Sequence, residues 1–162
     1  MHFTHIILIL LAGISMILTS CSSEQEKIQA EFNTNVLSNS TLLYEYTDTF
    51  SGATNNCAGT FIDKWYGSED VYQDVVKLYD EHLLNTGWVL WPEDVGRIWR
   101  KQNRAGLFSL SMTTLTKKRT TNPRGLYHLP DSLLLEAANY PTVYVISVRY
   151  MDAVHVKRCF GK

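Results

Sequence analysis

Histidines and carboxylates are the side chains of this chain that could supply acid–base catalysis or bind a metal. His82 falls in a helical apolar stripe, which favours a hydrogen-bonded core role over a base or ligand, and His128 and His155 are far apart in sequence. Glu93 and Asp94 lie between two expected strands, which is typical of a solvated turn. No GxSxG, HExxH or CxxC motif and no glycine-rich phosphate loop is present. The sequence therefore predicts no catalytic residue, no metal site and no cofactor.

The first 20 residues contain no Asp, Glu, Lys or Arg and include an apolar run of 13 residues over 6–18. This run is shorter than the roughly 20 residues that cross a bilayer as a helix, and it has the length of a signal-peptide core. Small residues and then a cysteine follow it. The segment Leu18-Thr19-Ser20-Cys21 resembles the lipobox of bacterial lipoproteins. The resemblance covers only this leader.

The lipobox resemblance implies that the Cys21 thiol receives a diacylglycerol and that the chain is cut before Cys21. We then expect a signal peptide over 1–20, a lipidated cysteine with a flexible polar tether over 21–40, and a single domain over 41–162. Ser22 directly follows the cysteine, and a serine at this position resembles the signal that sorts lipoproteins to the outer membrane if the source is Gram-negative. The alternative is an uncleaved anchor over 3–19 with Cys21 as an ordinary thiol. The expected location is the bacterial cell envelope.

Cys57 and Cys159 remain as an even pair once Cys21 is assigned to lipid. Disulfides persist in exported proteins, so a bridge between the two is the favoured interpretation. It would close a loop of about 100 residues and stabilise the fold by up to roughly 4.7 kcal/mol in the chain-entropy model. Two free thiols, or a metal site completed by a histidine, are the alternatives.

Charge is distributed unevenly along the chain. Residues 22–94 carry 13 acidic and 3 basic residues, whereas residues 95–130 carry 8 basic residues and no acidic one. This pattern indicates a surface facing a polyanion, internal pairing of a basic hairpin with an acidic helix, or a solvated basic face. We call the four bases of the long connection the basic segment; they are Lys117, Lys118, Arg119 and Arg124. We expect the basic segment to contact an envelope protein, a cell-wall polymer or anionic headgroups, and we expect no nucleic-acid partner.

Apolar and polar residues alternate in several segments, which predicts strands near 42–47, 60–66, 88–91, 97–101, 107–116 and 142–151. Ser68 as the N-terminal cap and an apolar stripe that starts at Val71 predict the main helix, with Gly87 as its C-terminal cap. A short helix is expected over 131–139. The expected fold class is α+β, with an antiparallel sheet of about five strands covered by one main helix (β-β-α-β-β-β, a two-layer sandwich). Residues 142–151 are apolar on both sides and should form a central strand.

Four tryptophans occur in the expected strands, at positions 65, 88, 91 and 99. Large aromatic side chains fill the cores of small domains, and this role is favoured over stacking on a sugar or another flat ligand. The sequence thus favours a non-catalytic lipoprotein that binds or scaffolds a partner through its sheet edge or its basic segment. The alternative is a small envelope enzyme with an unrecognised active site.

The lipobox resemblance predicts that the mature protein begins at a lipidated Cys21 and fractionates with membranes. Replacing this thiol in Cys21→Ala removes the only atom that could accept the diacylglycerol, so the variant should keep its leader uncleaved. Intact-mass spectrometry of the membrane fraction measures both processing and lipid. A Cys21→Ala protein that is still cut after Ser20 and stays membrane-bound would contradict the prediction.

Overall fold

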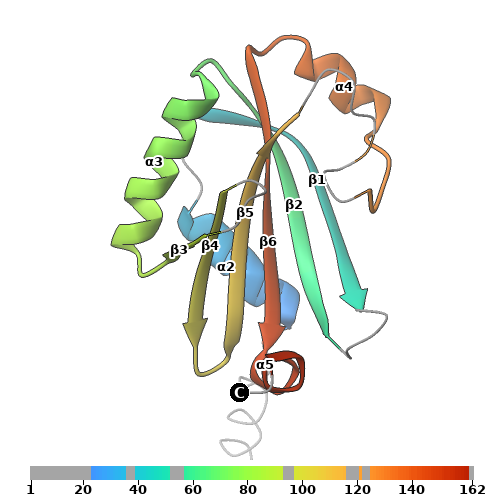
Figure 1. Ribbon diagram of the computed structural model, residues 1–162. Helices are drawn as coiled ribbons and strands as arrows, with labels where there is room; N and C mark the ends of the chain where they lie inside the picture. Colours follow the sequence, from blue (N-terminus) through green and yellow to red (C-terminus); the bar gives the residue numbers. More distant parts are fainter. Residues whose placement is uncertain are drawn as a thin grey trace, which may run out of the picture.

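A computed structural model of the chain describes residues 23–35, 39–51, 57–92, 97–115, 121 and 125–160. These residues form one antiparallel sheet with helices against both of its faces (Figure 1). The fold is α+β, as predicted. The elements in chain order are α2 (Glu24–Asn35), β1 (Ser40–Ser51), β2 (Ala58–Ser68), α3 (Tyr72–Asn85), β3 (Val89–Trp91), β4 (Arg97–Asn103), β5 (Gly106–Thr114), α4 (Asp131–Ala137), β6 (Thr142–Asp152) and α5 (Ala153–Phe160).

The sheet has six strands in the order β1-β2-β6-β5-β4-β3, and every neighbouring pair is antiparallel. The strand β6 lies between β2 and β5, so the prediction of a central final strand is confirmed. Its side chains alternate between the two faces, and most of them are buried on both. All six segments with strand periodicity form strands, including the short β3 beside β4, so the described sheet has one strand more than the order with about five.

The main core lies between the sheet and the helices α2 and α3. From α3 it takes Val75, Tyr79 and Leu83, which occur at helical spacing and are all buried. The alternate residues of β2, β5 and β6 meet them from the sheet. Figure 1 shows both helices crossing the same side of the sheet. The expected main helix therefore shares its face with a second helix.

The helix α2 occupies a segment for which the sequence predicts a flexible tether, and for Glu24–Asn35 that prediction is wrong. Ile28 is 0% and Phe32 is 2% exposed, and both belong to the main core. They are four residues apart, so they lie on one side of the helix and pack together against β2 and β6. The Lys64 ammonium lies 4.7 Å from the centre of the Phe32 ring. Two apolar residues at the right spacing are thus enough to bury a segment whose composition is otherwise polar.

The main helix begins three residues later than the sequence predicts, because its N-terminal cap is Val71 and not Ser68. Ser68 stays in β2, where it is paired with both Ser40 and Thr142, and its hydroxyl accepts a hydrogen bond from the Asp70 backbone N–H at 3.2 Å. Strand pairing thus takes the expected cap residue, and α3 starts after Val71 without a side-chain cap. Its C-terminal end agrees with the prediction. Gly87 adopts a φ of 85°, and the backbone N–H of Trp88 donates to the Leu83 carbonyl at 3.0 Å.

The opposite face of the sheet is covered at one end by α4 and the residues before it. Leu133 of α4 and Leu129 pack against Trp65, Val143 and Val145 of β2 and β6. The short helix over 131–137 agrees with the expected one, whereas α5 has no counterpart among the expected elements. Among the described residues, no helix is long and apolar enough to cross a membrane.

Burial of α2 predicts that Phe32→Ala lowers the free energy of unfolding by about 3–5 kcal/mol, because a phenyl ring leaves a cavity in the core. Gln25→Ala is the matched control, since Gln25 is exposed on the same helix and should change stability by less than about 0.5 kcal/mol. Urea denaturation followed by circular dichroism measures both. If the two variants unfolded at the same urea concentration as the parent, α2 would be a tether after all.

Candidate functional site

The residues proposed for lipidation and partner contact all lie outside the described residues: Cys21, Lys117, Lys118, Arg119 and Arg124. Among the described residues, Glu24 is three residues after Cys21, and Leu115 is two residues before Lys117. Glu24 and Leu115 lie beside opposite ends of the sheet.

The start of α2 lies beside the start of β2 and the end of β6. The Thr60 hydroxyl donates a hydrogen bond to Glu24 Oε2 at 2.8 Å. Thr60 is paired with Tyr150 across the β2–β6 ladder, and the Lys27 ammonium lies 5.3 Å from the centre of the Tyr150 ring. Glu24, three residues after Cys21, is therefore fixed at this end of the sheet, which we call the anchor end.

The chain enters the basic segment at the opposite end of the sheet, which we call the far end. The backbone N–H of Leu115 donates to the carbonyl of Val143, near the start of β6, at 2.8 Å. Val143 and Tyr150 are seven residues apart in one strand, which is roughly 24 Å at the rise of an extended chain. Leu115 and the start of α2 are therefore separated by most of the length of β6.

Two bases of the 95–130 stretch are paired inside the fold. Arg97 of β4 donates from Nε to Asp80 Oδ1 of α3 at 3.0 Å, and its second guanidinium nitrogen bonds the other carboxylate oxygen. Trp99 Nε1 donates to the same Asp80 Oδ1 at 2.9 Å. Lys101 bonds Glu31 of α2 at 2.6 Å. Internal pairing between the basic hairpin and acidic helices thus accounts for part of the charge asymmetry, and the basic segment lies outside the described residues.

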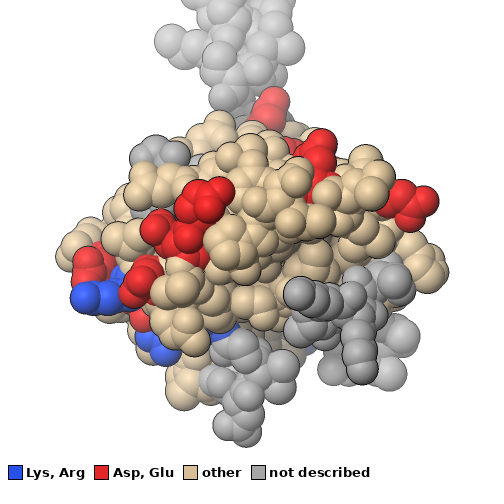
Figure 2. Space-filling view, turned by 90° about the horizontal axis from the view of Figure 1, so that it is seen from above, with Lys and Arg blue, Asp and Glu red and all other residues tan. Residues whose placement is uncertain are grey.

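Acidic side chains lie across the far end of the molecule, and Lys and Arg show mainly at one margin of this view (Figure 2). The chain passes through this end between β2 and α3 and again at α4, which carry Glu69, Asp70, Asp74, Asp131 and Glu136. The chain therefore enters the basic segment at an end where the described charge is negative.

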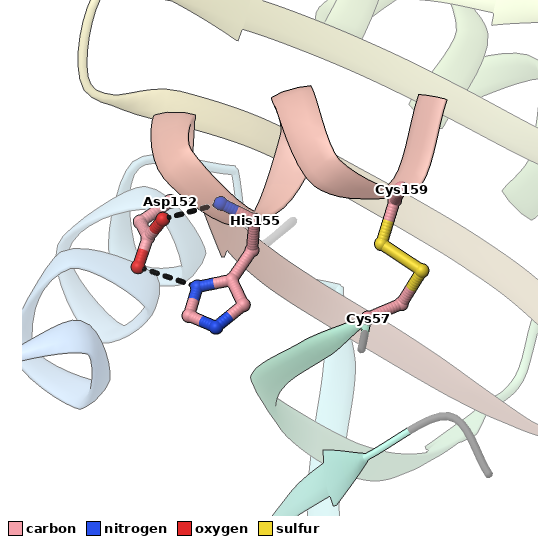
Figure 3. The surroundings of a disulfide bond; sticks show 4 residues. All are labelled: Cys57, Asp152, His155 and Cys159. Carbon is pink, nitrogen blue, oxygen red and sulfur yellow. Dashed lines mark hydrogen bonds and ion pairs between the residues drawn. A yellow bond between two sulfur atoms is a disulfide. The ribbon is translucent and has the colours of Figure 1, made fainter. Parts of the chain in front are cut away.

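The disulfide predicted from the cysteine count is present in the structure. Cys57 directly precedes β2 and Cys159 lies in α5, with their Cα atoms 5.4 Å apart at a sequence separation of 102 (Figure 3). Its physical effect is to hold the C-terminal helix against the anchor end. Because α5 buries none of its own residues, the covalent link replaces the core contacts that a short helix usually needs.

Asp152 and His155 form a second link at the start of α5 (Figure 3). The Asp152 carboxylate accepts a hydrogen bond from the His155 backbone N–H at 2.8 Å and contacts His155 Nδ1 at 2.8 Å. The backbone hydrogen bond, and next the ring, lower the pKa of Asp152 below its ordinary value. Because the pKa of Asp152 is lowered, this contact stabilises the start of α5 at pH values above the ordinary pKa of an aspartate. The stabilisation is lost as the pH falls below that value and the carboxylate is protonated. The arrangement is that of a helix start.

Of the other histidines singled out from the sequence, His82 has a structural position between two helices. His82 Nε2 lies 3.1 Å from Asn35 Oδ1 and 3.2 Å from the Thr34 carbonyl, so it joins α3 to α2 as a hydrogen-bonded, half-buried residue. His128 is exposed. Glu93 and Asp94 lie outside the described residues. No group of three or more His, Cys, Asp or Glu residues in the described part of the chain is arranged to hold a metal ion.

Three of the four tryptophans are core residues, as expected. Trp65, Trp88 and Trp99 are buried. Trp91, on the outer strand β3, is 44% exposed, and the Arg100 guanidinium lies 4.0 Å from the centre of its ring. This pair leaves one aromatic side chain at the sheet edge where a partner could reach it.

A buried polar cluster on β2 and β6 is not predicted from the sequence. Asp63 is 1% exposed, and its carboxyl group accepts hydrogen bonds from the hydroxyls of Ser147 and Tyr127, the latter at 3.0 Å. Trp65 Nε1 donates to the Tyr127 hydroxyl at 3.0 Å. The only signal in the sequence was the acidic residue between Phe61 and Trp65 on one side of a strand. Buried carboxyl groups need such partners, because desolvation without them is costly.

Tyr127 keeps its proton in this cluster. Burial, and next the negative charge of Asp63, raise the pKa of the Tyr127 hydroxyl far above its ordinary value. The hydroxyl is therefore a donor to Asp63 at neutral pH. Its ring stacks on Tyr46 of β1, with the ring centres 3.9 Å apart. The cluster ties the long connection before α4 to the sheet, and this structural role explains its composition.

Comparison with known proteins found no matching family model, no matching curated protein and no matching solved structure.

Loss of one hydroxyl tests the structural role of the polar cluster. Tyr127→Phe removes the partner of two buried groups, so we expect the free energy of unfolding to fall by about 1–3 kcal/mol. Tyr46→Phe is the matched control, because that hydroxyl contacts only the exposed Asp48 carboxylate among its described partners and should matter little. Thermal unfolding of both variants measures the difference. Equal stability of the two would show that the Tyr127 hydroxyl does not satisfy the cluster.

Proposed function

We propose that this chain is a lipid-anchored lipoprotein of the bacterial envelope that binds a partner without catalysis, through the basic segment. The observation that supports it best is the position of the two ends: the chain leaves the lipobox at the anchor end and enters the basic segment at the far end. In this arrangement, attachment to the membrane at one end does not block binding of a partner at the other end. The fold then works as a spacer about as long as its central strand.

The separation of the two ends argues against the anchoring membrane as the ligand of the basic segment. Charges in solution are screened over about 8 Å at physiological ionic strength. Val143 and Tyr150, which mark the two ends, are separated by roughly 24 Å of strand. Headgroups beneath the anchor end would therefore have little electrostatic effect at the far end, where the chain enters the basic segment. An acidic envelope protein or an anionic cell-wall polymer, reached from the other side, fits this geometry better.

The outer strand β3 offers a second contact region. Val89 is 64% exposed, and Trp91 lies beside it on the same short strand with Arg100 over its ring. Exposed apolar residues on an outer strand are a recurrent feature of partner contacts. The arginine adds a positive charge to this edge, so an acidic partner would be attracted to both regions.

The quadruple variant Lys117→Ser, Lys118→Ser, Arg119→Ser and Arg124→Ser tests the proposal. We expect its binding to purified cell wall and to partners cross-linked in membranes to fall at least several-fold at low salt, because four attractive charges are lost. Binding of the parent should weaken as salt rises. Co-sedimentation with cell wall and quantitative cross-linking measure the two partners separately.

Lys77→Ser with Arg104→Ser is the control, since both bases are exposed and lie elsewhere in the fold. This double variant should bind like the parent. If the quadruple variant also bound like the parent at low salt, the basic segment would be a solvated surface, and the contact would have to be sought at β3.

A further inference from the structure

We infer that the outer side of α5 lies on the surface of the anchoring membrane, so that this C-terminal helix lies between the bilayer and the rest of the domain. The inference deepens the proposed function and depends on lipidation of Cys21. It concerns a lipid surface, not a protein partner, and it assigns a role to a helix that the sequence analysis did not foresee.

The first argument is the short distance between the anchor and the folded domain. Glu24 begins α2, and three residue steps separate it from Cys21, a reach of at most about 11 Å. Because Ile28 and Phe32 fix α2 against the sheet, no long tether lets the domain turn away from the bilayer. The anchor end must therefore lie at the lipid surface.

The second argument is that α5 belongs to this same end. It follows β6 directly, and the backbone N–H of Ala153 donates to the Ala105 carbonyl at 3.1 Å. The Tyr150 hydroxyl donates to the same carbonyl at 2.7 Å, and Tyr150 is the residue beneath Lys27 of α2. The disulfide to Cys57 holds the C-terminal end of α5. Figure 1 shows α5 beyond the ends of β5 and β6, at the opposite end of the molecule from α4.

The third argument is the chemistry of the outer side of α5. Val154 is 58% and Phe160 is 50% exposed, although both are large apolar residues. Lys157 and Arg158 lie between them in sequence and are also exposed, whereas His155 and Cys159 make the contacts toward the domain. Helical spacing places the two apolar and the two basic residues on one broad side. Apolar side chains that enter the acyl boundary, next to bases that meet anionic headgroups, are typical of helices at a membrane interface.

The charges around α5 include acids as well as bases. Glu24 and Glu26 lie at the start of α2 and Asp152 at the start of α5, while Lys27 and Arg104 add positive charge at the same end. Glu24 is held by Thr60 and Asp152 by His155, so both carboxylates have partners in the protein. Lys157 and Arg158 are the bases on the exposed side of the helix itself. Attraction to the membrane should thus be local to α5 and modest in size.

Fluorescence quenching in vesicles tests the inference on the mature lipidated protein. Phe160→Trp places a reporter on the outer side of α5, and Leu135→Trp places one on α4, where Leu135 is 75% exposed at the far end. Vesicles of phosphatidylethanolamine and phosphatidylglycerol carry bromine on their acyl chains as the quencher. Relative to the parent protein, we expect added emission that is strongly quenched for Phe160→Trp and unquenched for Leu135→Trp.

Removal of the two bases separates the electrostatic contribution. In the Phe160→Trp background, Lys157→Ser with Arg158→Ser should reduce quenching in vesicles with phosphatidylglycerol and leave it unchanged in vesicles of phosphatidylcholine alone. Equal quenching of the double variant and its parent in the anionic vesicles would remove the headgroup contact from the inference.

The outcomes distinguish this inference from the proposed function. A lipidated Cys21 with no quenching at position 160 would overturn the inference and leave the proposed function standing. A dimer in sedimentation that Phe160→Ser abolishes, again without quenching, would assign the outer side of α5 to a second copy of the chain and overturn it equally. An unmodified Cys21 in membrane fractions would contradict the proposed function and the inference together.

Discussion

The burial of β6 on both faces is the constraint on which the rest of the structure depends. Its side chains alternate between the two sides of the sheet, and nearly all of them are buried, so each side must be covered. The helices α2 and α3 cover one side, and α4 with Tyr127 and its neighbours covers part of the other. A central strand that needs two layers is the reason why a polar N-terminal segment becomes a helix of the core.

This constraint sets the orientation of the molecule. With Ile28 and Phe32 in the core, α2 cannot act as a tether, and the first residue of the helix is fixed beside Thr60 and Tyr150. A lipid on Cys21 would then hold the domain close to the bilayer with one defined end toward it. The proposed partner contact at the far end and the proposed membrane contact at α5 both follow from that single packing interaction.

Polar contacts and the disulfide secure the elements that the core alone does not hold. Asp80 accepts hydrogen bonds from Arg97 and Trp99 and so joins α3 to β4, whereas Asp63 joins the connection before α4 to the sheet through Tyr127. The Cys57–Cys159 disulfide does the same for α5, which buries no residue. The outer surfaces of α5 and β3 therefore do not pack in the core, and both expose apolar residues.

The sequence by itself determined the fold class, the central position of the final strand, the C-terminal cap at Gly87 and the cysteine pair, because periodicity, turn chemistry and residue counts are local properties. Burial of α2 was decided by the tertiary structure. The two apolar residues of this polar segment are buried because an apolar face of the sheet is present for them to pack against. Strand pairing moved the start of α3 away from Ser68. Tertiary structure also decided where the described chain borders the proposed anchor and the basic segment, because Glu24 and Leu115 are placed at opposite ends of one sheet by contacts between residues that are distant in sequence.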